Sequence, residues 1–216
     1  MNDVKHSGVV TTNDKVGSIV TIQHSEPTIT LFGRVAAGFV GYVGLLGSGG
    51  KKDLHFTLII EDPYTGIFGF DGQPDMDPNV SPSAKDVILG VAAPFYGISR
   101  ALSTIKIKTN YYRDTLPDEV VIKIKIDPPQ GMAASVFASK LISKACGFAN
   151  YKLEYSAPNG VIGATMVKGE YNSNSYMAGL LQSVMGYVPV INTPGYQVPG
   201  WNSPIPPEYF KDASCN

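Results

Sequence analysis

The segment LHFTLIIEDPYTGIFGF, residues 54–70, decides the expected fold. Its first seven residues are rich in β-branched and aromatic side chains, which favour strands. The DPYTG stretch at 62–66 contains turn-forming residues, and 67–70 resumes as apolar strand sequence. We therefore predict a β-hairpin in which His55 lies near the start of the first strand and Asp71 lies just beyond the second.

Further strands are predicted on both sides of this hairpin. Residues 18–23 and 28–32 precede it, and residues 104–108 and 120–126 follow it. The last two segments alternate apolar residues with lysine at a period of two, which is typical of strands with one solvated face. We predict that these two pair as a second hairpin, and that 151–155 is a further candidate strand.

Two helices are predicted in the second half of the chain. The first, MAASVFASKLISKACGF at 132–148, follows the helix-start signal Asp127-Pro128-Pro129. Its predicted buried face includes Met132, Val136, Leu141 and Cys146. The second, SNSYMAGLLQSVM at 173–185, is expected to end at Gly186.

The order of these elements predicts an α+β fold with an antiparallel sheet packed against helices. A chain of 216 residues is long enough for one well-buried core. We expect a single domain over 1–216, with a core spanning 18–186. Residues 187–216 are rich in proline, glycine and aromatic side chains at their start, which predicts an extended tail laid over the domain.

Charge is sparse and nearly balanced, with 17 Lys and Arg against 18 Asp and Glu. There is no basic field to attract a nucleic-acid backbone, so nucleic acid is excluded as an expected partner. The polar start at 1–14 lacks the pattern of a signal peptide, and we expect a cytoplasmic location in the producing cell. The apolar runs at 35–46 and 87–98 are too short to span a bilayer, although they leave peripheral membrane contact as an alternative to burial in the core.

Metal and cofactor signals are weak. Cys146 and Cys215 are too few for a disulfide framework or a zinc site, and a bridge between them is the less favoured alternative. Residues 47–52 depart from the phosphate-loop pattern. The cluster Asp71, Asp75 and Asp77 lacks the terminal glutamate of a calcium loop. We expect neither a metal nor an organic cofactor.

Three histidines are available for acid–base chemistry, and only His55 opens a strand. His6 lies in the polar terminus and His24 beside a predicted loop. Taken alone, His55 would be expected to have a structural role. The segment EYNSNSYMAGLL at 170–181, a polar cluster leading into the second helix, changes this expectation. A nucleophile at a helix start gains from the macrodipole and from unpaired N–H groups that can receive an oxyanion. Simple capping by Asn172, Ser173 or Asn174 is the competing interpretation.

The order of motifs resembles the circularly permuted NlpC/P60 (papain-like) hydrolase superfamily, which includes the lecithin:retinol acyltransferase-like proteins. The resemblance spans about residues 50–186 and depends on LHFTLII and YNSNSYMAGLL. It implies a papain-like fold with His55 as general base, Ser173 at the position of the nucleophilic cysteine, and Asp71 orienting the histidine. Tyr171, Asn172 and Asn174 would then line the substrate and oxyanion site, together with the backbone N–H of Ser173.

Serine in place of cysteine leaves three interpretations open: a natural serine nucleophile, an inactive relative, or an engineered substitution. The resemblance implies a hydrolase of amide bonds, a peptidoglycan peptidase or amidase. It further implies a secreted antibacterial toxin effector delivered to the target-cell periplasm, with an immunity or secretion-carrier protein as partner. The alternatives are a phospholipase-like lipid acyl hydrolase or acyltransferase, and a catalytically inactive binding domain.

Overall fold

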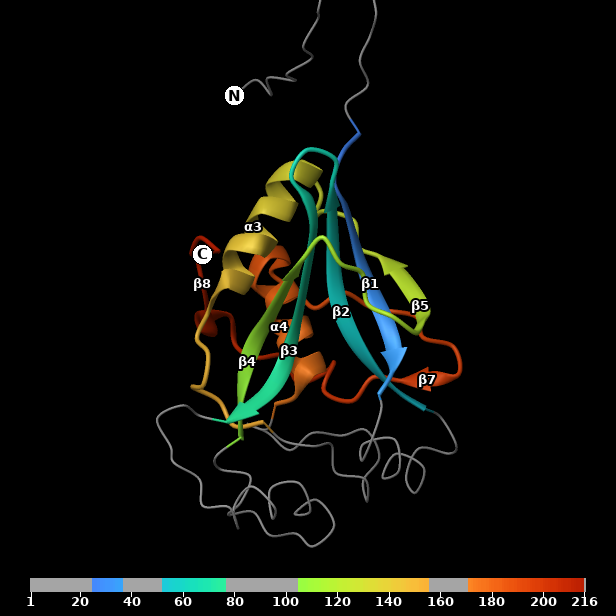
Figure 1. Cartoon of the computed structure of the whole chain (residues 1–216), viewed down its shortest axis with the longest axis vertical. Coiled ribbons are helices and arrows are strands. Elements are labelled where there is room, and N and C mark those ends of the chain that lie inside the picture. The colour runs from blue at the N-terminus through green and yellow to red at the C-terminus, as the bar shows by residue number, and fades with distance from the viewer. Residues whose placement is uncertain (1–24, 37–51, 77–104, 156–170, 216) are drawn as a thin grey trace, which may run out of the picture.

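The computed structural model describes residues 25–36, 52–76, 105–155 and 171–215. In these ranges the chain has an α+β fold, in which an antiparallel sheet packs against two helices (Figure 1). The sheet has the order β4-β3-β2-β1-β5. Its strands are β1 (Thr28–Val35), β2 (Lys52–Asp62), β3 (Gly66–Met76), β4 (Ile105–Arg113) and β5 (Val120–Lys125). The expected strand at 18–23 lies outside the described residues, so the single-domain prediction for 1–216 stays a prediction.

The predicted hairpin of β2 and β3 is confirmed, and both strands are longer than expected. Their register runs from Leu58↔Phe70 to Asp62↔Gly66. The turn is stabilised by the Asp62 carboxylate, which accepts hydrogen bonds from the backbone N–H groups of Tyr64 and Thr65 at 2.8 and 2.9 Å. The sequence between 62 and 66 therefore folds as its turn chemistry indicated.

The predicted second hairpin is wrong. β4 pairs with β3 and β5 pairs with β1, so the two strands lie at opposite edges of the sheet. The connection between them passes in front of the middle strands in Figure 1. A period of two shows which face of a strand is solvated, and it does so correctly for β5, but it does not determine the pairing partner. The candidate strand at 151–155 is also wrong, because it contributes only isolated bridges at Glu154 and Tyr155.

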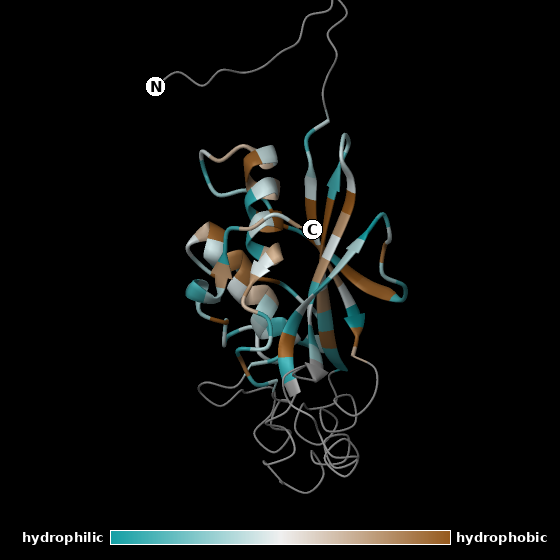
Figure 2. Cartoon of the chain, turned by 60° about the vertical axis from the view of Figure 1, so that its left-hand side comes forward, coloured by the Kyte–Doolittle hydropathy of each residue, from teal (hydrophilic) through white to brown (hydrophobic). Residues whose placement is uncertain are grey.

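The helices α3 (Ala134–Cys146) and α4 (Ser173–Met185) lie together on one side of the sheet (Figure 2). α4 has the predicted bounds and ends at Gly186, whose φ of 81° places it in the left-handed region. α3 is shorter than predicted and buries Ala134, Phe137, Ala138, Leu141 and Ala145. Val136 was expected on this face but is 47% exposed, because the neighbouring Phe137 faces the core instead.

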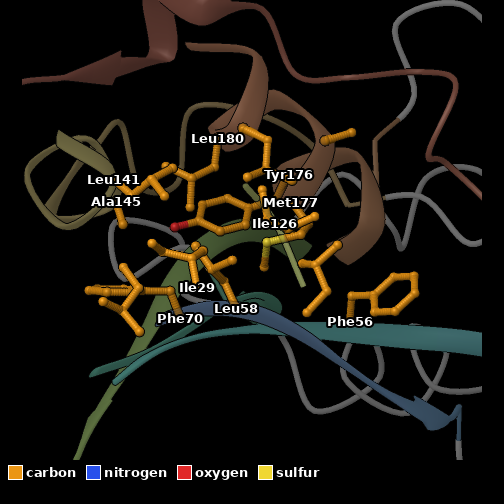
Figure 3. Close-up of a cluster of buried hydrophobic side chains, with 14 of the residues drawn as sticks. Ile29, Phe56, Leu58, Phe70, Ile126, Leu141, Ala145, Tyr176, Met177 and Leu180 are labelled. Carbon is orange, nitrogen blue, oxygen red and sulfur yellow. The ribbon is translucent and has the colours of Figure 1, made fainter. Parts of the chain in front are cut away.

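The core forms where α4 meets the sheet. Figure 3 shows the side chains of Tyr176, Met177 and Leu180 from the helix against Ile29, Leu58 and Phe70 from the strands. All of these are buried, and the Tyr176 ring also contacts Phe148 and Phe210. α4 is therefore anchored along its length, which fixes the position of its N-terminus.

The C-terminal segment packs over the helices, as predicted. It contains β7 (Tyr196–Gln197), which pairs in parallel with the start of β2, a 3-10 turn at Pro207–Tyr209, and β8 (Phe210–Lys211), which pairs with β6 (Gly147–Phe148). Trp201, Ile205 and Phe210 are buried. Cys146 and Cys215 form a disulfide with a Cα–Cα distance of 5.1 Å, so the bridge that the sequence disfavoured is present. The β6–β8 pairing explains it, because that pairing brings the end of α3 beside the end of the tail.

Replacing Cys146 and Cys215 together by serine is expected to lower the free energy of unfolding by about 2–4 kcal/mol. The bridge joins residues 69 positions apart, so its loss frees a long loop in the unfolded chain. Urea denaturation of the variant and of the oxidised parent measures the difference. Equal denaturation midpoints would contradict this expectation.

Candidate active site

The site lies where β2 and β3 separate. Their ladder ends at Leu58↔Phe70, after which β2 continues beside β1 and β3 continues beside β4 (Figure 1). His55 and Asp71 lie on these diverging segments. The N-terminus of α4 contacts the same region, because Asn174 in its first turn hydrogen-bonds to the β2 backbone. His55, Asp71 and the N-terminus of α4 therefore lie close together at the point where β2 and β3 diverge.

Ser173, His55 and Asp71 form a hydrogen-bonded row. The His55 Nδ1 atom lies 2.9 Å from the Ser173 Oγ atom, and His55 Nε2 lies 3.0 Å from Asp71 Oδ2. The His55 side chain is 15% exposed and that of Asp71 is fully buried. The structure therefore brings together the three residues that the sequence assigned to catalysis.

The row sets the tautomer of His55. An ionised carboxylate can only accept, so Nε2 donates its proton to Asp71 and Nδ1 faces the Ser173 hydroxyl with its lone pair. This is the form that a general base requires. The ring orientation is the reverse of the triad in chymotrypsin-like proteases, where Nε2 faces the serine.

Asn172 caps the helix, as the competing interpretation of the polar cluster expected. Its Oδ1 atom accepts from the N–H groups of Asn174 and Ser175 at 2.9 and 3.0 Å, and its Nδ2 donates to the Pro199 carbonyl at 3.1 Å. Capping leaves Ser173 as the first helical residue. The two interpretations of this cluster are therefore compatible.

Asn174 holds α4 against β2. Its Oδ1 atom accepts from the Phe56 N–H at 3.1 Å, and its Nδ2 donates to the Leu54 carbonyl at 2.7 Å. These partners flank His55 on both sides, so the amide fixes the strand position that carries the histidine. The side chains of Asn172 and Asn174 border the cleft, and these hydrogen bonds join them to the backbone of the surrounding elements.

Tyr171 is not among the residues that line the cleft in the described part of the chain, so its assignment as a substrate residue stays a prediction. Its backbone forms an isolated bridge with Tyr155. Burial raises the pKa of the Tyr171 phenol, and the nearby Tyr209 and Glu208 raise it further, which places the ring on the side of the C-terminal segment.

The cleft in front of Ser173 has a volume of about 290 Å³. Its lining includes the charged residues Arg34, Asp53 and Glu119, besides His55 and Ser173. Asp53 is buried, which raises the pKa of its carboxyl, and its Oδ1 accepts a hydrogen bond from Gln197 of β7 that opposes this rise. Side chains of both signs therefore line the cleft in front of Ser173.

Tyr155 is a cleft residue that the sequence did not indicate. Burial raises the pKa of its phenol, while hydrogen bonding with the side chain and the backbone of Ser173 lowers it in part. Tyr155 and Ser173 line the same cleft. Its place in an irregular segment, 18 residues before Ser173, carries no recognisable motif.

No family model, curated protein or solved structure matches the chain. Within the described ranges, no group of three or more histidine, cysteine, aspartate or glutamate side chains is arranged to hold a metal ion. No helix in that part of the chain has the length and apolar character to cross a membrane.

Proposed function

We propose that the protein is a hydrolase of the papain-like, permuted NlpC/P60 type, in which Ser173 attacks an amide carbonyl. The observation that carries the proposal is the 2.9 Å contact between His55 Nδ1 and Ser173 Oγ, with Asp71 behind the histidine. A nucleophile within hydrogen-bond reach of its base, with the base oriented by a third group, is the general signature of covalent catalysis. The position of Ser173 at the start of α4 supports the same conclusion.

The proposed reaction uses the hydrogen-bonded row of Ser173, His55 and Asp71. His55 Nδ1 takes the hydroxyl proton as Ser173 Oγ bonds to the carbonyl carbon, and the carbonyl π electrons move to its oxygen. The tetrahedral intermediate collapses, the C–N bond breaks, and the leaving amine takes the proton from His55. A water molecule then repeats the sequence on the acyl-serine and releases the acid. Asp71 stabilises the imidazolium in both halves.

The developing oxyanion would be received by the Ser173 N–H and the Tyr155 hydroxyl. Both residues line the cleft, and the Ser173 N–H lies at the start of α4. We expect Tyr155→Phe to lower kcat by about 10²-fold, the effect of removing one oxyanion donor. Steady-state hydrolysis by parent and variant measures this. A variant with the parent's kcat would exclude Tyr155 from the oxyanion site.

The charged lining favours a polar peptide substrate. Arg34 offers a cation to a carboxylate, while Asp53 and Glu119 offer anions to an amine. Peptidoglycan stem peptides carry both groups, whereas an acyl chain would have to desolvate these charges without pairing them. We therefore infer that the scissile bond is an amide in a peptidoglycan peptide.

A periplasmic site of action, as for a delivered antibacterial effector, agrees with the Cys146–Cys215 bridge. Disulfides persist in oxidising compartments such as the bacterial periplasm and are rare in the cytosol. The proposal therefore includes action outside the producing cytoplasm, with an immunity or carrier protein as the partner that such a route requires.

A lipid acyl hydrolase is the second candidate, and the C-terminal segment favours it. Tyr187 is 52% exposed and Val190 is fully exposed, beside a groove lined by Val188, Ile191 and Trp201. Apolar side chains gathered in this way suit contact with a lipid surface.

Incubation with purified peptidoglycan and, separately, with phospholipid vesicles tests these proposals. Release of muropeptides with new amino termini by the parent, and not by a Ser173→Ala control, is the expected result. Fatty-acid release would instead support the lipid candidate. Release of no product from either substrate would support the inactive binding domain and contradict the proposed function.

A further inference from the structure

The carboxylate of Asp71 is held from the neighbouring strand β4 by a tyrosine. The Tyr112 hydroxyl donates to Asp71 Oδ2 at 2.6 Å. The other groups that face this oxygen, apart from His55, are farther away: Thr57 Oγ1 at 3.5 Å and an Arg34 nitrogen at 3.7 Å. Asp71 Oδ1 is buried and has no hydrogen-bond partner in the described part of the chain. Tyr112 therefore makes the shortest contact that restrains this carboxylate.

The fold provides a specific space for this contact. In the β3–β4 register, Tyr112 lies opposite Gly69 and Asn110 lies opposite Asp71. The tyrosine ring must therefore cross the face of β3 diagonally to reach Asp71. A side chain at position 69 would block it, because a Cβ atom there would lie 2.2 Å from Tyr112 Cδ2. Gly69 therefore leaves the space that the Tyr112 ring occupies.

The phenol is kept in its donating form. Burial raises the pKa of Tyr112, and the charge of Asp71 and the hydrogen bond between them raise it further. A neutral phenol that donates to a carboxylate makes a strong, charge-assisted hydrogen bond. Tyr112 does not line the cleft, so it has no direct route to a substrate.

We propose that Tyr112 is a positioning residue: its hydroxyl fixes the Asp71 carboxylate, which holds His55 in the tautomer and orientation that deprotonate the nucleophile at 173. The inference rests on the proposed function, since it assigns Tyr112 to that reaction. Besides Tyr112, the titratable and charged groups around Asp71 are His55 from β2 and Arg34 from β1. The phenols of Tyr155 and Tyr176 interact with its charge from farther away.

A thiol at position 173 reports on His55 without any substrate. In a Ser173→Cys background the native cysteines are in their disulfide. The rate of alkylation by iodoacetamide therefore measures the reactivity of the new thiol. We expect Tyr112→Phe to slow alkylation at neutral pH by about tenfold, because a misplaced histidine stabilises the thiolate poorly. The matched control is Tyr176→Phe, which removes a buried phenol bonded to Thr109 at 3.1 Å and should leave the rate unchanged.

Nitrogen-15 NMR of the parent chain provides a second measurement, the tautomer population of His55. Loss of a purely structural contact would not change this population. We expect His55 to carry its proton on Nε2, and Tyr112→Phe to increase the population protonated on Nδ1. Gly69→Ala, which displaces the ring while keeping the phenol, should have the same effect. In an Asp71→Ala background, Tyr112→Phe should add no further loss of alkylation rate, because both act through one carboxylate.

Unchanged alkylation and tautomer populations in Tyr112→Phe would overturn the inference, and so would an equal loss in Tyr176→Phe. The expected alkylation and NMR results in a chain that cleaves no peptidoglycan would support the positioning role while contradicting the proposed function. The two failures are therefore distinguishable.

Discussion

Ser173→Ala is expected to lower amide hydrolysis by at least about 10⁴-fold while the fold is kept. The substitution removes the side-chain oxygen that attacks the carbonyl carbon in the first step of the proposed reaction. It leaves the Asn172 cap of α4 in place, because that cap uses the N–H groups of Asn174 and Ser175. The thermal midpoint should therefore stay close to that of the parent.

Ser183→Ala is the matched control for this variant. It makes the same change in the same helix, where the Ser183 hydroxyl donates to the Leu180 carbonyl at 2.7 Å. Its hydrolysis rate should equal that of the parent. A Ser173→Ala variant that keeps a tenth or more of the parent rate would show that another group is the nucleophile.

Asp71→Ala has the second-largest expected effect, a fall in kcat of about 10⁴-fold. Without the carboxylate, His55 loses the acceptor that fixes Nε2–H and the charge that stabilises its imidazolium. KM should change little, since Asp71 does not line the cleft. Initial rates over a range of substrate concentrations separate the two constants.

Asp71→Asn should be milder than Asp71→Ala. His55 and Tyr112 both bond to Oδ2, so an amide oxygen can occupy that position while the NH₂ group takes the place of the unpartnered Oδ1. The tautomer is then kept and only the charge is lost. Equal losses in the two variants, or a raised KM with an unchanged kcat, would contradict this account of Asp71.

The elements with local signals were predicted well. The turn at 62–66 and the helix α4 depend on residues close in sequence, namely Asp62 at the turn and Asn172 and Gly186 at the helix ends. The partners of β4 and β5 could not be predicted, because alternation determines the faces of a strand and not its neighbours. The Cys146–Cys215 bridge was disfavoured for a related reason, since it follows from the non-local pairing of β6 with β8.

The site was predicted in part. His55 was singled out because it opens a strand, and the roles of His55, Ser173 and Asp71 were implied by the family resemblance. The structure brings the three side chains together. Tyr112 and Tyr155 were missed, because their contacts depend on strand register and on an irregular segment. Asn174 borders the cleft, and its bonds to the β2 backbone could not be foreseen from a polar cluster that also suited capping.

The central claim is that His55 activates Ser173 as a nucleophile. Peptide mapping after reaction with a fluorophosphonate probe tests it without a known substrate. We expect one adduct on Ser173 in the parent chain and a loss of labelling in His55→Ala. No adduct at Ser173, or labelling at the same rate without His55, would contradict the claim.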